Sequence, residues 1–148
     1  MINARRLLRR SPAEWRALVA AATLSVAVRL VLAVLPFRSA LKLVRRLARP
    51  SRFASRPAGE RERVVWAVHA VGRRLFPSKP CLTEALVGFL LLRRRGIPAE
   101  LHLGVEKDDE KPGIRAHAWL ESEGRVVVGG EESPSRYRRL PSLETIGR

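Results

Sequence analysis

The sequence predicts an α+β fold in which several helices come first and a small antiparallel sheet follows. Up to about residue 95, apolar side chains recur at the three- and four-residue spacing of helices. Beyond that point the period changes to two, which is typical of half-buried strands. The strands are predicted at residues 99–105, 116–122 and 125–128, and a tight turn at Glu123-Gly124 joins the last two.

Length and composition restrict the classes of protein that this chain can be. Its 148 residues suffice for one domain of ordinary size, and a hydrophobic content of 46% excludes a wholly disordered chain. The formal charge of +15 is concentrated in residues 1–63, which hold a net charge of +12. We therefore divide the chain into a basic, apolar helical region, residues 1–59, and a core, residues 60–148.

A basic chain suggests nucleic acid, anionic lipid or an acidic protein as a partner. Nucleic acid is disfavoured because the sequence has no zinc-finger spacing and no aromatic RNA-binding signature. Aromatic residues make up only 5% of the chain and do not interleave with the basic runs, so a base-stacking platform is not expected. A solvated, arginine-rich surface explains the charge equally well.

The first predicted helix begins at Ser11 and ends just before Pro36. Ser11 and Glu14 have the spacing of a capping box, and Pro36 prevents continuation. The helix is apolar enough to be considered as a membrane span, but Arg16 and Arg29 interrupt it. Three interpretations follow: a buried or partner-docking helix of the fold, a membrane-associated helix, or a cleaved signal peptide.

Three further helices are predicted between proline and glycine breaks. The first of them, at residues 39–48, is amphipathic and basic. The last has the clearest end, because Gly96 suits a left-handed C-cap and Pro98 prevents continuation. After the strands, we expect the tail beyond Pro134 to be basic and irregular. These helices are expected at residues 39–48, 60–75 and 81–95.

Cys81, the only cysteine, occupies the first position of the last of these helices. A lone thiol excludes an intrachain disulfide framework and a zinc site built from several cysteines, and it favours a reducing, cytoplasmic location. At a helix start, the dipole and the unpaired N–H groups favour a thiolate and can stabilise an oxyanion. Cys81 is therefore a candidate nucleophile, and the alternative is a small, inert buried residue.

His117 is the candidate base for this nucleophile. It lies on the predicted strand 116–122, and a helix packed across the sheet can bring its N-terminus to a strand histidine. Strand alternation puts His117, Trp119 and Glu121 on one face, with Ala118 and Leu120 on the other. The alternative is a structural histidine on a mixed face.

Three other titratable residues are expected to have no catalytic role. His69 lies in mid-helix as a surface or hydrogen-bonded histidine, His102 lies on the solvent side of its strand, and Glu84 is a helix-surface charge. With three histidines and one cysteine, the chain has little material for a metal centre, and we expect none.

Two blocks of sequence at this spacing resemble a known family. The run CLTEALVGFLLLRRRGIPAELHLGV and the later run AHAWLESEGRVVVGG are similar to the transglutaminase-like cysteine protease of lasso peptide biosynthesis. The resemblance covers residues 80–130, and the Leu-Pro-Phe-Arg stretch at residues 35–38 adds a less specific similarity. It implies a papain/transglutaminase-like fold, with the catalytic cysteine at a helix N-terminus and the histidine on the sheet.

The resemblance also implies roles for individual residues. Cys81 would be the nucleophile and His117 the general base, which later acts as the acid. The family has an acidic residue about a dozen positions after the histidine, where this sequence has Gly129. Glu131 is the nearest choice for a third catalytic residue, and a backbone carbonyl that orients the imidazole is the alternative. No cofactor, nucleotide or metal is implied.

The implied function is removal of the leader from a ribosomally made lasso precursor peptide. The chain resembles the stand-alone form without a leader-recognition domain, so we expect a separate leader-binding protein and a separate lasso cyclase as partners. Two alternatives stay open at this point. One is a non-catalytic peptide-binding scaffold on the same fold, and the other is a basic membrane-associated protein with peripheral contact through its N-terminal helix. The residues would also suit acyl transfer to an amine.

Overall fold

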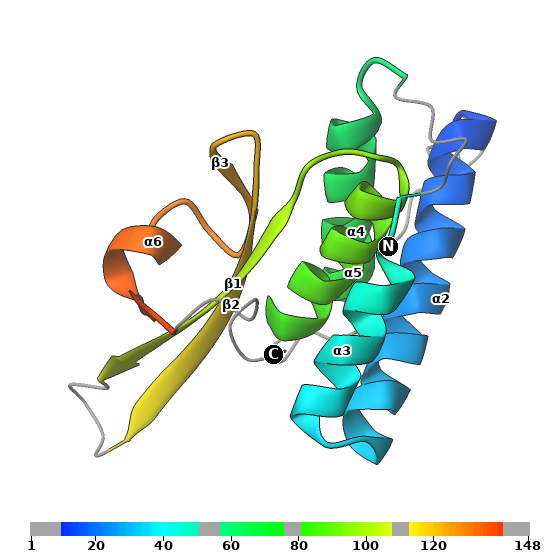
Figure 1. Ribbon diagram of the computed structural model, residues 1–148. Helices are drawn as coiled ribbons and strands as arrows, with labels where there is room; N and C mark the ends of the chain where they lie inside the picture. Colours follow the sequence, from blue (N-terminus) through cyan, green and yellow to red (C-terminus); the bar gives the residue numbers. More distant parts are fainter. Residues whose placement is uncertain (1–9, 51–56, 76–80, 108–112, 141–148) are drawn as a thin grey trace.

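A computed structural model describes residues 10–50, 57–75, 81–107 and 113–140. It confirms the α+β fold, with the helices first and the antiparallel sheet after them. Figure 1 shows α4 and α5 between the sheet on one side and α2 and α3 on the other. The helices are α2 (Pro12–Val34), α3 (Phe37–Leu47), α4 (Glu60–Leu75) and α5 (Cys81–Arg94).

The predicted capping box begins α2. The Ser11 hydroxyl accepts from the Glu14 N–H at 3.2 Å, and the Ser11 N–H donates to the Glu14 carboxylate at 2.7 Å. Pro12 occupies the first helical position, where its missing N–H costs nothing. The helix ends at Val34, two residues before Pro36. The capping box and Pro12 therefore begin the helix as the sequence predicts, and the helix ends before Pro36 as predicted.

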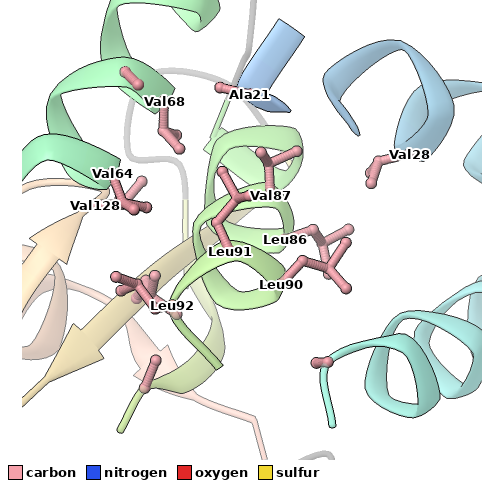
Figure 2. Packing of buried hydrophobic residues seen from close by; sticks show 14 of the residues in the cluster. Ala21, Val28, Val64, Val68, Leu86, Val87, Leu90, Leu91, Leu92 and Val128 are labelled. Atoms are coloured by element: carbon pink, nitrogen blue, oxygen red, sulfur yellow. The ribbon is translucent and has the colours of Figure 1, made fainter. Parts of the chain in front are cut away.

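The hydrophobic core surrounds α5. Nine of the fourteen residues of this helix are buried, and they contact helices on one side and the sheet on the other (Figure 2). Residues from α2 and α3 join the same hydrophobic cluster as those from α4, α5 and the sheet. Examples are Ala21, Val44, Val68, Leu86 and Val128. The proposed boundary between residues 59 and 60 stays a prediction.

The sheet of the described residues has four antiparallel strands in the order β3-β2-β1-β4. β2 pairs with β1 along its length, whereas β3 pairs only with the last residues of β2. The β2–β3 turn places Glu123 at φ +52° and Gly124 at φ +76°, the left-handed backbone of a two-residue hairpin turn. The strands are β1 (Glu100–Lys107), β2 (Ile114–Ser122), β3 (Arg125–Val128) and β4 (Arg138–Arg139).

The prediction of an irregular tail was wrong up to residue 140, and the rest of the tail, residues 141–148, lies outside the described residues. Residues after Gly130 form a short helix, α6 (Ser133–Arg136), and the strand β4. Both are fixed by tertiary contacts: Arg136 pairs with Glu106 of β1, and the Leu140 N–H donates to the Leu103 carbonyl at 2.8 Å. Elements of four and two residues are too short to show a hydrophobic period, so the sequence pattern does not predict them.

Among the described helices, α2 is the one long and apolar enough to cross a membrane, judged by length and composition. In the structure one face of α2 packs on α4 and α5. The buried positions recur every three or four residues, as expected of a helix with one covered face. They are Ala17, Ala21, Ser25 and Val28.

Candidate active site

Cys81 is the first residue of α5, and its side chain is partly exposed. The structure thus confirms a thiol at the start of the central helix. The first N–H groups of any helix lack intrahelical partners and carry the positive end of its dipole. A partly exposed thiol at this position can meet a substrate and can be stabilised as an anion.

Two contacts fix the direction of α5 relative to β2. Gly88 lies against Leu120, so closely that a Cβ on Gly88 would be 2.9 Å from Leu120 Cδ2. Beyond the end of α5, the Ser122 hydroxyl donates to the Pro98 carbonyl at 2.6 Å. The helix and the strand therefore run in the same direction.

This direction allows the positions of Cys81 and His117 along their elements to be compared. From Gly88 back to Cys81 the helix rises about 10 Å, and from Leu120 back to His117 the strand covers about 10 Å. The two candidate residues therefore lie at about the same level. The faces differ, however: Ala118 and Leu120 point to the α5 side, while His117 shares the opposite face with Trp119, as the alternation predicts.

The imidazole of His117 is held by a backbone carbonyl. Its Nε2 lies 2.7 Å from the Gly129 oxygen and 3.1 Å from the Ser133 hydroxyl, and that hydroxyl itself donates to the Gly129 oxygen at 2.7 Å. A carbonyl only accepts, so Nε2 must carry the proton. In this tautomer Nδ1 is the basic nitrogen, which is what proton abstraction from a thiol requires.

Gly129 can present its carbonyl because it has no side chain. The β2–β3 ladder ends at the Leu120–Val128 pair, and the next residue, Gly129, leaves it at φ +103°. A Cβ here would lie 2.6 Å from Trp119 Cβ and 2.9 Å from the Ala118 oxygen. Both the backbone angle and the space therefore require glycine.

Aromatic rings fix the plane of the His117 imidazole. The ring stacks on Tyr137 with 4.6 Å between the ring centroids. Trp119 lies on the same face of β2, and its ring centroid is 6.3 Å from that of His117. Trp119 is fully buried and donates from its indole N–H to Glu121 at 3.0 Å. The segment after β3 thus supplies Ser133 and Tyr137, two of the contacts that orient the candidate base.

No contact joins the three predicted site residues Cys81, His117 and Glu131 in the described part of the chain. Among the described residues, no hydrogen bond joins the Cys81 thiol to His117, so their pairing stays a prediction. Glu131 is exposed, lines an open depression with Arg61 and makes no hydrogen bond or ion pair with His117. In place of the family's acid, the acceptor for His117 is the carbonyl of Gly129, the alternative that the sequence left open.

Glu84 is not a helix-surface charge, contrary to expectation. It is buried, and its carboxylate lies 3.3 Å from His69 Nδ1, while His69 Nε2 lies 3.3 Å from the Val127 oxygen. Gly72 makes room for it, since a Cβ there would lie 1.7 Å from Glu84 Oε1. The hydrogen bond that His69 donates to the Glu84 carboxylate raises the pKa of His69, which favours its protonated form, and the pair links α4, α5 and β3.

His102 also differs from the expectation of solvent exposure. It is half-buried and stacks on Trp119 with 5.5 Å between ring centroids. Burial lowers its pKa. Within the described part of the chain, no cluster of three or more histidine, cysteine or acidic residues could hold a metal ion.

The fold and the site define a class: an α+β fold of cysteine peptidases and transglutaminases, with a thiol at a helix start and a histidine on an antiparallel strand. The chain belongs to the transglutaminase-like superfamily, whose core family model matches residues 22–142. The match begins within α2 and ends beyond β4. Comparisons with curated proteins and with solved structures give no significant match.

Proposed function

We propose that this protein is a cysteine peptidase that removes the leader from a ribosomally made lasso precursor peptide. The observation that supports the proposal is the contact of His117 Nε2 with the Gly129 oxygen at 2.7 Å, because it favours the tautomer in which Nδ1 carries no proton and can act as the base. Membership of the transglutaminase-like superfamily supports a thiol mechanism. The sequence blocks around Cys81 and His117 support the choice of the lasso substrate.

The first half of the proposed reaction forms a thioester. His117 Nδ1 takes the proton of the Cys81 thiol, and the sulfur attacks the carbonyl carbon of the scissile amide. The negative charge that develops on oxygen is stabilised by N–H groups of the first turn of α5. The carbon–nitrogen bond then breaks, the leader stays on Cys81 as a thioester, and His117 gives its proton to the departing amine of the core peptide.

The second half releases the leader. A water molecule gives a proton to His117 and attacks the thioester carbonyl, which yields the leader carboxylic acid and restores the thiol. The hydrogen bond from Nε2–H to the Gly129 carbonyl stays in place throughout, because the proton cycles through Nδ1. The proposed partners are a separate leader-binding protein and a lasso cyclase that closes the freed core, all in a reducing cytoplasm.

Cleavage of a precursor peptide tests the proposal. The purified protein is incubated with a lasso precursor peptide and its leader-binding protein, and mass spectrometry follows the appearance of free leader. We expect cleavage by the wild type and a loss of at least about a thousandfold in Cys81→Ala, which removes the nucleophile.

The controls separate chemistry from folding. Cys81→Ala should give the same circular dichroism spectrum and the same Tm within a few degrees, because only one thiol is lost. Retained cleavage in this folded variant would refute the cysteine mechanism. A wild type that binds the precursor without cutting it would instead favour the peptide-binding scaffold.

A further inference from the structure

One face of α2 is apolar, continuous and exposed in the described part of the structure. Large apolar side chains recur along it at intervals of four, seven, four and four residues, and each is between 43% and 78% exposed. On a helical wheel they lie opposite the buried positions such as Ala17 and Ala21, which pack on α4 and α5. We call these residues the α2 stripe: Trp15, Val19, Val26, Leu30 and Val34.

The stripe belongs to a helix that is apolar on all sides. Its most apolar 18-residue window has a mean hydropathy of 2.3, yet only 22% of that window is buried. A helix of this composition normally lies wholly inside a protein or in lipid. The described elements that pack on α2 cover one side of it, and its exposed side has the apolar composition of a surface that contacts lipid.

The charge around the stripe has a single sign. Residues 15–59 contain nine lysines and arginines and no acidic residue. On α3, which lies beside α2 in Figure 1, basic side chains at intervals of four residues are exposed, and one more exposed arginine follows just beyond the helix. They are Arg38, Lys42 and Arg46 on the helix and Arg49 after it.

We propose that the α2 stripe and the basic side of α3 dock this protein on an anionic membrane surface. A bilayer supplies both chemistries that the surface presents, an apolar interior beneath negatively charged headgroups. A protein partner would need an apolar groove about 28 Å long, the span of the stripe, together with acids placed for each arginine. Residues 15–59 carry only positive charges and no acidic side chain, and this favours an anionic lipid surface over a protein partner.

The packing of α2 determines how it would meet the bilayer. Because the opposite face is held by α4 and α5, the helix can lie in the plane of the interface but cannot cross the membrane without leaving the fold. The two arginines of α2, Arg16 and Arg29, can then extend toward the headgroups along their aliphatic stems. The sheet, with His117, lies on the far side of α5 from α2 (Figure 1).

Sedimentation with lipid vesicles tests the docking. One set of vesicles is phosphatidylcholine alone, and a second contains about one third phosphatidylglycerol, an anionic lipid. We expect the wild type to sediment with the anionic set and to be released by high salt. The double variant Val19→Gln, Leu30→Gln should bind at least about tenfold more weakly, since two inserted apolar side chains are lost.

A matched control comes from the sheet. Ile114 is 75% exposed on β2, outside the stripe, and Ile114→Gln makes the same chemical change without altering docking. Equal binding by the wild type and the double variant, or no binding to anionic vesicles, would overturn the proposal. Self-association without lipid that the double variant abolishes would also overturn it, and would assign the stripe to a second copy of the chain. The assay needs no peptidase activity, so its outcome is independent of the proposed function.

Discussion

The side chain of His117 shows how a backbone group can take the place of an acid. In a catalytic triad the carboxylate both fixes the imidazole tautomer and stabilises the imidazolium that forms. The Gly129 carbonyl fixes the tautomer at 2.7 Å but brings no full negative charge. Ser133, fully buried, donates to the same oxygen and so acts as a positioning residue for His117.

Ser133→Ala tests this role. Loss of one hydrogen bond, worth about 1 kcal/mol, should lower kcat for leader cleavage roughly fivefold at unchanged KM. Steady-state kinetics measure both constants, and Ser133→Thr, which keeps the hydroxyl, should restore part of the rate.

Two further variants serve as comparisons. Ser135→Ala removes an exposed hydroxyl that bonds only within its own turn, and Glu131→Ala removes the acid that the sequence offered as a third catalytic residue. Both should cleave at nearly the wild-type rate. A roughly fivefold loss in Glu131→Ala, with none in Ser133→Ala, would reverse the two assignments.

The elements of the fold differ in how far the sequence determines them. α2, α4 and α5 have caps, prolines or a clear apolar period, and their predicted ends agree with the structure to within one residue. α6 and β4 depend on contacts with β1 and β2, which no local pattern encodes. A weak signal was present in the Ser133-Pro134 pair, which resembles the Ser-Pro start of α2.

The candidate site was predictable to a similar extent. Cys81 and His117 could be chosen from their places at a helix start and on an alternating strand. The buried state of Glu84 could not, because it depends on Gly72 of α4, twelve residues away, leaving space for the carboxylate. Long-range packing of this kind appears only when both helices are in place.

The His69–Glu84 pair between α4 and α5 should make stability depend on pH. The pKa of His69 is raised in the folded protein by Glu84. Its contribution is therefore fully present below the unfolded value of about 6.5 and is lost as pH rises through the folded pKa. Urea unfolding should show the wild type losing its advantage over His69→Gln across this range.

His102 provides the opposite control. Burial lowers its pKa, so the unfolded chain binds more protons, and this residue makes stability rise with pH through the same region. His102→Gln should remove that rise. A wild-type advantage over His69→Gln that is independent of pH would mean that His69 is not an imidazolium in the fold.

On the scale of the whole molecule, α5 is the central element of the fold. It contacts α2, α3 and α4 on one side and three strands on the other, and its first residue is Cys81. The N-terminal helices α2 and α3 and the elements from α4 onward therefore share one core. The position of the thiol depends on both.

A truncated chain tests whether residues 60–148 form a domain by themselves. Without α2 and α3, the α4 and α5 surfaces that bury Ala21, Val28 and Val44 would be exposed to water. Burial of such side chains stabilises by about 1 to 3 kcal/mol each, comparable in sum with the total stability of a small domain. We expect no cooperative thermal transition by circular dichroism. A cooperative melt would establish residues 60–148 as an independent domain.

The central claim is that His117 activates Cys81, and alkylation of the thiol measures this directly. The chain has one cysteine, so the rate of reaction with iodoacetamide reports on Cys81 alone and needs no knowledge of the substrate. At about neutral pH, we expect His117→Ala to react at least about tenfold more slowly than the wild type, and His102→Ala to react at the wild-type rate. Equal rates in the wild type and His117→Ala would contradict the account.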